Sequence, residues 1–296
     1  MRTLPISQKH ISISADSSLA AAATIIFWAS AFTGIRIGLE SYAPTSLALL
    51  RFLVASAVIG IYAFKVRLPL PPLTDLPRLT ALGFLGFTVY HIGLSWGETQ
   101  VPAGTASFII SSETIYMVIL ASLFLKEPTN RTIWTGIFTS FTGVALISFS
   151  NGDSFSLNPM ALLVLIAAIS KAIFSIWQKP LLQRYGALPV VAYTMWLGTA
   201  LMLPFFPQLV ADIQTASIDS TAAIIYMGIF PGAIAYFGWG YMLARLPASI
   251  VGSFIYLIPV LATFLAWVWL GEVPSITAFI GGVLVLAGVL VVHRGR

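Results

Sequence analysis

The sequence predicts an all-α polytopic membrane protein with ten transmembrane helices, arranged as two inverted five-helix repeats around a central cavity. Three observations lead to this fold class. Hydrophobic residues make up 58% of the 296 residues and charged residues only 8%, which is too little charge for the surface of a soluble protein. Ten apolar segments are long enough to cross a bilayer. One long stretch of the chain also recurs, in register, in the second half.

The ten segments follow from the length that an apolar helix needs. About 20 residues cross the ~30 Å of hydrocarbon in a bilayer. The connections are short, and prolines stand near most of the expected helix starts, where a missing N–H costs nothing. The expected spans run roughly over 18–37, 45–64, 78–97, 104–125, 131–150, 157–179, 188–208, 220–243, 248–270 and 274–293.

The stretch from Gly83 to Gly143 matches a second stretch 145 residues later without a gap. Matches of glycine, proline and glutamate in one register do not follow from shared hydrophobicity. We therefore divide the chain into a tail (1–17) and two repeats (18–150 and 157–293). The matched pairs are Gly83 with Gly228, Gly93 with Gly238, Pro102-Ala103 with Pro247-Ala248, Glu127 with Glu272, Gly136 with Gly281, and Gly143 with Gly288; earlier, Pro44 matches Pro189.

The basic residues predict the orientation. With the N-terminus inside, twelve of the fifteen Lys and Arg residues fall in cytoplasmic segments, which is the positive-inside pattern, so both termini are expected in the cytoplasm. Each repeat has five spans, an odd number, so the second repeat enters the membrane upside down. Inverted repeats are a transporter architecture that offers two near-equivalent conformations. The twelve are Arg2, Lys9, Lys65, Arg67, Arg78, Lys126, Arg131, Lys179, Arg184, Arg245, Arg294 and Arg296.

The second half also resembles a known family. The sequence LPASIVGSFIYLIPVLATFLAWVWLGE, followed by the Gly-rich span through Gly281 and Gly288, is similar to an EamA domain, the repeated five-helix unit of the drug/metabolite transporter superfamily. The first half matches at Pro102-Ala103 and Lys126-Glu127. It departs where Thr114 stands opposite the helix proline Pro259.

This resemblance implies a ten-helix carrier in the bacterial inner membrane that works by alternating access, often as an exporter. Within the superfamily the chain looks most like bacterial exporters of aromatic and other neutral amino acids. Carriers of nucleotide sugars or sugar phosphates are the alternative. They need a cationic cavity, for which only Lys171 and Arg51 could serve.

Glu113 is the clearest candidate for a substrate-binding residue. It lies near the middle of the fourth expected span, with Tyr116 about one turn later. A carboxyl group at this depth is costly and needs a reason. It either meets a substrate amine, carries a proton, or is a protonated group hydrogen-bonded inside the bundle.

The third expected span contributes Tyr90, His91 and Ser95. At 1.5 Å per residue, His91 and Glu113 lie within about one turn in depth. A histidine and a glutamate facing across a cavity would suit a zwitterion. The alternative is a structural histidine bonded to a backbone carbonyl. Trp96 is interpreted as an interface anchor.

The sixth expected span carries Lys171, with Ser175 and Gln178 at near-helical spacing. Lys171 either faces the cavity, as a partner of Glu113 or of a substrate carboxylate, or extends toward the cytoplasm along its apolar stem. For Arg51, near the outer end of the second span, solvation at the loop end is the simplest interpretation.

Aromatic residues are the other candidate lining, since amphipathic rings without dense charge suit neutral, bulky metabolites. Glycine pairs at helical spacing are interpreted as close helix packing. Glu127 and Glu272 are interpreted as structural helix ends, with gating around them as the alternative. The candidate aromatics are Trp28, Phe32, Trp177, Tyr236, Trp239 and Tyr256.

Other functions lack sequence support. There is no cysteine, the three histidines lie far apart, and no phosphate-binding Gly-Lys-Ser/Thr loop is present. No cofactor, metal or catalytic residue is therefore expected, and an enzyme or a channel is a weaker hypothesis. The basic residues do not cluster, which argues against nucleic acid. The expected partners are a small-molecule substrate, the lipid bilayer and protons, and the chain is expected to be a monomer.

Overall fold

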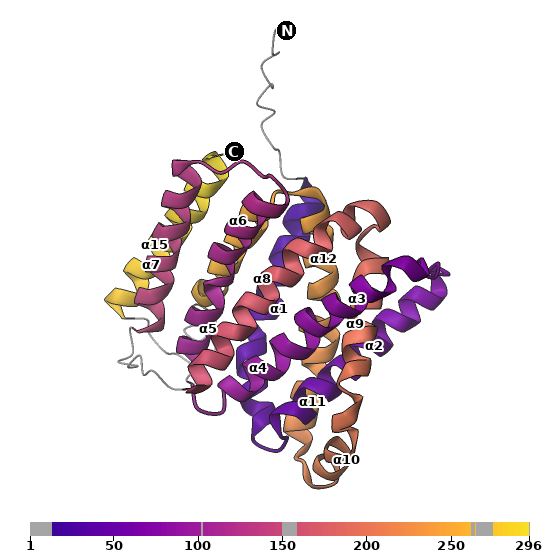
Figure 1. Cartoon of the computed structure of the whole chain (residues 1–296). Helices are drawn as coiled ribbons and strands as arrows, with labels where there is room; N and C mark the ends of the chain where they lie inside the picture. Colours follow the sequence, from indigo (N-terminus) through magenta and orange to yellow (C-terminus); the bar gives the residue numbers. More distant parts are fainter. Residues whose placement is uncertain (1–13, 102, 150–158, 262–263, 265–274, 296) are drawn as a thin grey trace.

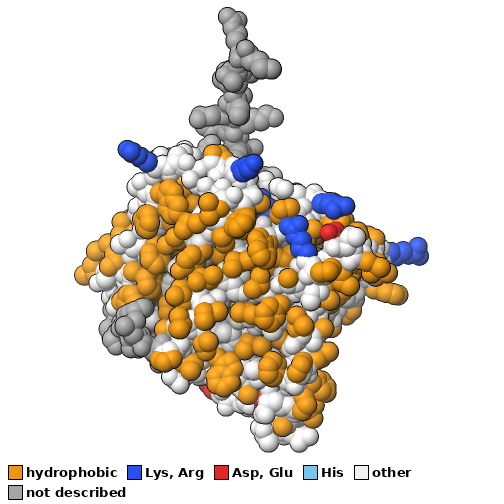
Figure 2. All heavy atoms as spheres, in the orientation of Figure 1, with side chains coloured by type: hydrophobic (Ala, Val, Ile, Leu, Met, Phe, Trp, Pro, Cys, Tyr) orange, Lys and Arg blue, Asp and Glu red, His pale blue; other side chains and the backbone are white. Residues whose placement is uncertain are grey.

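The computed structural model describes residues 14–101, 103–149, 159–261, 264 and 275–295, and in these ranges the regular secondary structure is helical. Seven of the described helices are long and apolar enough to cross a membrane, or eight if a pair bent by 45° counts as one span. Apolar side chains cover the flank of the molecule, and lysines and arginines gather at the end that carries both chain termini (Figures 1 and 2). We call this end the terminal face.

The first repeat begins at the terminal face and crosses the molecule five times. Its third crossing is assembled from three consecutive helices, and its fourth from two. The elements are α1 (Ala15–Leu39), α2 (Pro44–Lys65), η1 (Leu73–Asp75), α3 (Leu76–Gly83), η2 (Phe84–Val89), α4 (Tyr90–Gly97), α5 (Ala103–Ser111), α6 (Glu113–Phe124) and α7 (Arg131–Ser148).

The second repeat begins at the opposite face. The ninth crossing of the chain is the fourth of this repeat, and it is helical from Ala248 to Leu261. The predicted remainder of that span and Glu272 lie outside the described residues. The elements are α8 (Pro159–Tyr185), α9 (Ala187–Leu201), η3 (Leu203–Phe205), α10 (Phe206–Thr215), α11 (Ile218–Met227), η4 (Gly228–Ile234), α12 (Ala235–Arg245), α13 (Ala248–Ser253), η5 (Phe254–Tyr256) and α15 (Ile276–Arg294).

Helix α7 and its copy α15 establish that the repeats are inverted. A side chain on Gly136 would clash with the carbonyl oxygen of Gly288, 2.6 Å away, and one on Gly143 with that of Gly281 at the same distance. The order of these contacts makes the two equivalent helices antiparallel. They stand side by side at one edge of the molecule (Figure 1). The interpretation of these glycines as packing residues is confirmed.

Two hydrogen bonds join residues that occupy the same position in the two repeats. His91 bonds to Tyr236, and Ser140 donates to the carbonyl of Val285; each pair is 145 positions apart. Equivalent residues of two copies can touch only at the two-fold axis that relates the copies. The axis therefore passes between α4 and α12 and between α7 and α15.

Both repeats interrupt their α-helices at the same places. The π-helical turns η2 and η4 end 145 residues apart, at Val89 and Ile234, and η4 contains Pro231, which cannot donate a helix hydrogen bond. The first repeat has Gly86 at that position. A Cβ on it would strike the ring of Phe174, so the absence of a side chain lets α8 approach.

The second equivalent break lies halfway along the fourth and ninth crossings. In the ninth crossing the 3₁₀ turn η5 precedes Pro259, whose missing N–H explains the interruption. In the fourth crossing the break falls at Ser112. Ser111 and Ser112 donate back to the carbonyls of Ser107 and Ile109, which weakens the regular α-helical pattern.

Candidate functional site

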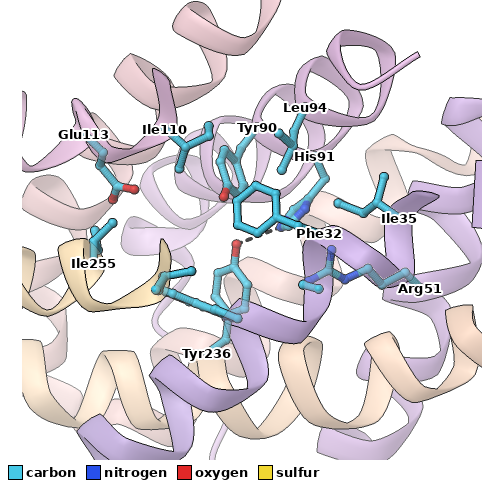
Figure 3. Close-up of a pocket in the computed structure, with 13 residues that line it drawn as sticks. Phe32, Ile35, Arg51, Tyr90, His91, Leu94, Ile110, Glu113, Tyr236 and Ile255 are labelled. Carbon is cyan, nitrogen blue, oxygen red and sulfur yellow. Dashed lines mark hydrogen bonds between the residues drawn. The ribbon is translucent and has the colours of Figure 1, made fainter. Parts of the chain in front are cut away.

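A cavity lies between the two repeats, beside the axis. The cavity has an open side, and its volume of about 470 Å³ includes space that is open to solvent. Its lining comes from α1, α2, α4, the α5–α6 break, α12 and the ninth crossing. The residues are Trp28, Ala31, Phe32, Ile35, Arg51, Tyr90, His91, Leu94, Ile110, Glu113, Tyr236, Ile255 and Ile258 (Figure 3).

Helix α1 contributes one complete face to the cavity. Trp28, Ala31, Phe32 and Ile35 recur at the spacing of a single helix face. The indole N–H of Trp28 donates to the carbonyl of Pro231, 3.2 Å away in the π-helical turn η4. The π-helical turn of the second repeat thus fixes the orientation of the Trp28 ring, which the first repeat contributes.

The His91–Tyr236 pair forms the wall on the axis. The His91 Nε2 and the Tyr236 hydroxyl are 2.7 Å apart, and the dashed line in Figure 3 marks this bond between α4 and α12. Both side chains are buried. The partner of His91 is therefore a side chain of the other repeat and not the backbone carbonyl considered from the sequence.

Glu113 lies in the first turn of α6, immediately after the break at Ser112. A carboxylate is favoured there because the N-terminus of a helix carries partial positive charge. The hydroxyl of Ser175 donates to Glu113 at 3.4 Å. Figure 3 shows the carboxylate directed into the cavity beside Ile110 and Ile255.

Lys171 lies behind the rings of Trp28, Tyr90 and Tyr236, on their side away from the cavity lining. Its ammonium is 3.8 Å from the ring centre of Tyr236 and 5.0–5.2 Å from those of Trp28, Phe174 and Tyr90. The side chain is only 1% exposed, so it does not extend toward the cytoplasm. Electrostatic attraction couples it to Glu113 without a contact ion pair, and the rings stabilise the cation through their faces.

Arg51 contradicts its interpretation as a solvated loop-end residue. It is 3% exposed and lines the cavity. It lies in the half of α2 that is farther from the terminal face, as the position in the sequence predicts. The expectation failed because the side chain turns inward, where it lines the cavity together with His91 and Tyr236.

Glu98 is a further buried charge, and its sequence position did not mark it as a candidate. It follows the last residue of α4 and is 1% exposed, and neither carboxylate oxygen has a hydrogen-bond partner among the described residues. Burial raises the pKa of Glu98 to about 8, against the opposing effect of Arg36 and Arg51. Its position just beyond a predicted span gave no signal of burial.

Seven predicted residues do not line the cavity: Lys171 and Ser175, described above, and five others. Trp177 is 43% exposed on the outer side of α8, so its assignment to the lining is wrong; two residues from Ser175, it points away from the bundle interior. Tyr116 is half-buried in the core. The other three are buried outside the lining: Ser95, Tyr256, and Trp239, whose ring packs 5.1 Å from that of Trp28.

The terminal face is closed by a cluster around Glu127. Its carboxylate accepts from the ammonium of Lys179 at 2.6 Å and from the backbone N–H of Ala248 at 2.9 Å. Lys179 also donates to the carbonyl of Leu246. These bonds tie the end of the fourth crossing to α8 and to the start of α13. We call this cluster the terminal latch.

Metal binding has no support in the described ranges, where no three His, Cys, Asp or Glu side chains come together as ligands. The cavity instead combines aromatic faces, one carboxylate and one guanidinium. Such a lining can hold an apolar or aromatic group and, at separate places, a positive and a negative group.

Comparisons with known proteins identify the family of the chain. The profile of the EamA-like transporter family matches residues 17–149 and 158–294. The chain belongs to the EamA-like transporter family. Its members are transporters, and the predicted resemblance is thereby confirmed.

Individual relatives cover most of the chain. It is 41% identical to "Uncharacterized transporter YdfC" of Bacillus subtilis, over 88% of this chain and 86% of the relative. It is 39% identical to a "Probable terminal-alkyne amino-acid exporter" of Streptantibioticus cattleyicolor, over 92% and 91%. "Uncharacterized inner membrane transporter YedA" of Escherichia coli is 28% identical, over 91% and 88%. One crystal structure shares the fold with a TM-score of 0.75 and 18% identity, covering 93% of this chain and 95% of that chain.

Proposed function

We propose that this EamA-family protein exports neutral amino acids, aromatic ones included, across the bacterial inner membrane by alternating access. The observation that carries the proposal is the cavity itself, where Glu113 lies among apolar and aromatic side chains beside the axis. The 39% identical relative described as an amino-acid exporter supports the same substrate class.

The chemistry of the lining favours a substrate that carries few charges. Phe32, Tyr90 and Tyr236 offer ring faces to an apolar or aromatic side chain. Glu113 either accepts the substrate ammonium or carries a coupling proton. Ser175 holds the carboxylate of Glu113 through a hydrogen bond. The bond from Trp28 to the carbonyl of Pro231 holds the indole ring of Trp28.

The two ends of the molecule support alternating access. The terminal latch holds Glu127, Lys179 and Ala248 together at one end, while the cavity lies beyond it toward the opposite face. We infer that the terminal face is cytoplasmic, because the described lysines and arginines concentrate there (Figure 2). The conformation is then closed to the cytoplasm.

A counterflow panel in liposomes tests the function. Purified protein is reconstituted with internal unlabelled leucine or phenylalanine, and uptake of the labelled amino acid is measured with and without a proton gradient. We expect saturable uptake that large neutral amino acids inhibit. Inhibition by a nucleotide sugar or a sugar phosphate, with indifference to every neutral amino acid, would reject the proposal.

A further inference from the structure

Arg51 is a cavity residue whose charge has no counterpart. It is 3% exposed, and Figure 3 shows its side chain reaching from α2 toward His91 and Tyr236. No hydrogen bond or ion pair joins its guanidinium to the described part of the chain, and its Nε is buried without a partner. The ring of Phe52, 5.4 Å away, is its cation–π contact.

An unpaired guanidinium at this depth is an expensive arrangement. Arginine stays charged at any physiological pH, and a charge inside a membrane protein normally faces a partner or a polar pathway. One cation–π contact at this distance offsets only part of the cost of desolvation. An anion that enters the cavity would supply the partner that this charge lacks.

The buried carboxylates do not fill this role. Glu98 acts electrostatically on Arg51, but the two do not form an ion pair within 4 Å, and both Glu98 oxygens lack hydrogen-bond partners. Glu113 lies on the opposite side of the cavity, with Tyr90 and Tyr236 between them (Figure 3). Lys171 is also a buried cation, and it lies against the ring of Tyr236 and outside the lining.

We propose that Arg51 binds the carboxylate of the transported substrate and selects for substrates that carry one. The planar guanidinium matches a carboxylate through two parallel N–H···O bonds. This inference rests on the proposed function for the identity of the substrate. The ammonium and carboxylate of an α-amino acid share one carbon atom, so a carboxylate on Arg51 leaves Glu113 to the far end of the substrate or to a proton.

The test compares three ligands that differ in their charged groups: phenylalanine, 3-phenylpropionate, which lacks the ammonium, and phenethylamine, which lacks the carboxylate. Binding is measured by ligand-induced thermal stabilisation of wild-type protein and of Arg51→Gln. We expect Arg51→Gln to weaken binding of the two carboxylates by about ten- to a hundredfold and to leave phenethylamine unchanged. Arg51→Lys should recover part of the affinity.

Arg36→Gln is the matched control, because Arg36 is exposed and does not line the cavity. The melting temperature of the ligand-free protein separates binding from a structural role. Removing an unpaired buried charge should not lower it. Lower ligand-free stability with unchanged carboxylate affinity would overturn the inference. Arg51-dependent binding of 3-phenylpropionate without amino-acid flux would reject the proposed function and leave the role of Arg51 standing.

Discussion

The two repeats place the same helices around the axis and different side chains beside it. Where the first repeat has Tyr90, the second has Ala235. Where the first has Glu113, the second has Ile258, and both of these line the cavity. The breaks in the helices, by contrast, are shared. The two repeats thus share the breaks in their helices, whereas only the first repeat supplies a carboxylate to the cavity.

The two ends of the molecule also differ in how their charged side chains are paired. At the terminal face Glu127 and Lys179 are paired, while toward the opposite face Arg51 and Glu98 lie buried without partners in the described ranges. The position equivalent to Lys179 is Gly34, whose missing side chain is filled by Met227. A symmetric fold therefore carries different charged groups at its two ends.

The largest effect is expected at the glycines that hold α7 against α15. Gly136→Leu and its counterpart Gly281→Leu should each reduce folded protein severely, because both helices meet backbone to backbone there. Overpacking of this kind costs about 1–3 kcal/mol or more. Size-exclusion profiles and thermal unfolding in detergent would measure it.

Gly282→Ala is the control within α15, because the nearest atom to its added Cβ is 3.9 Å away. It should behave like wild type. Equal damage from Gly136→Leu and Gly281→Leu would support the equivalence of the two repeats. Damage from only one of them would contradict it.

A smaller, conformational effect is expected at the terminal latch. The double variant Glu127→Gln/Lys179→Gln removes both charges, so no lone buried charge remains to unfold the protein. We expect the terminal face to open more often. Since the chain has no native cysteine, the opening can be followed by maleimide labelling of Ser253→Cys, whose side chain is fully buried.

Labelling should accelerate by about tenfold, equivalent to a change of roughly 1.4 kcal/mol in the opening equilibrium. Arg245→Gln, an exposed charge at the same face, serves as the control and should leave the rate unchanged. An unchanged rate in the double variant, with normal folding, would show that the latch does not hold this end closed.

Much of the fold could be predicted from the sequence, because apolar length and the register of Gly, Pro and Glu specify spans and inversion. The break at Pro259 could be expected for the same reason. The break at Ser112 could not, since it depends on two serines bonding back to the helix. The count of ten spans stays a prediction, because part of the ninth span lies outside the described residues.

The site was less accessible to prediction. Depth along a helix placed Glu113, His91 and Tyr90 correctly in the cavity wall. The depth of a residue along a helix does not tell which way its side chain points around the helix axis. For this reason the prediction that Trp177 lines the cavity is wrong, since the side chain faces outward. The burial of Arg51 and Glu98 depends on contacts between distant segments, which one sequence does not reveal.

The central claim, a symmetric scaffold with a one-sided site, is tested most directly by moving the carboxylate to the equivalent position. Initial rates of phenylalanine counterflow, or of the best substrate in the panel, are compared for wild type, Glu113→Ile, and the swap Glu113→Ile/Ile258→Glu. We predict that Glu113→Ile lowers the rate at least about tenfold. The swap should fold normally and remain as slow. Recovery of the wild-type rate in the swap, or a wild-type rate in Glu113→Ile alone, would contradict the account.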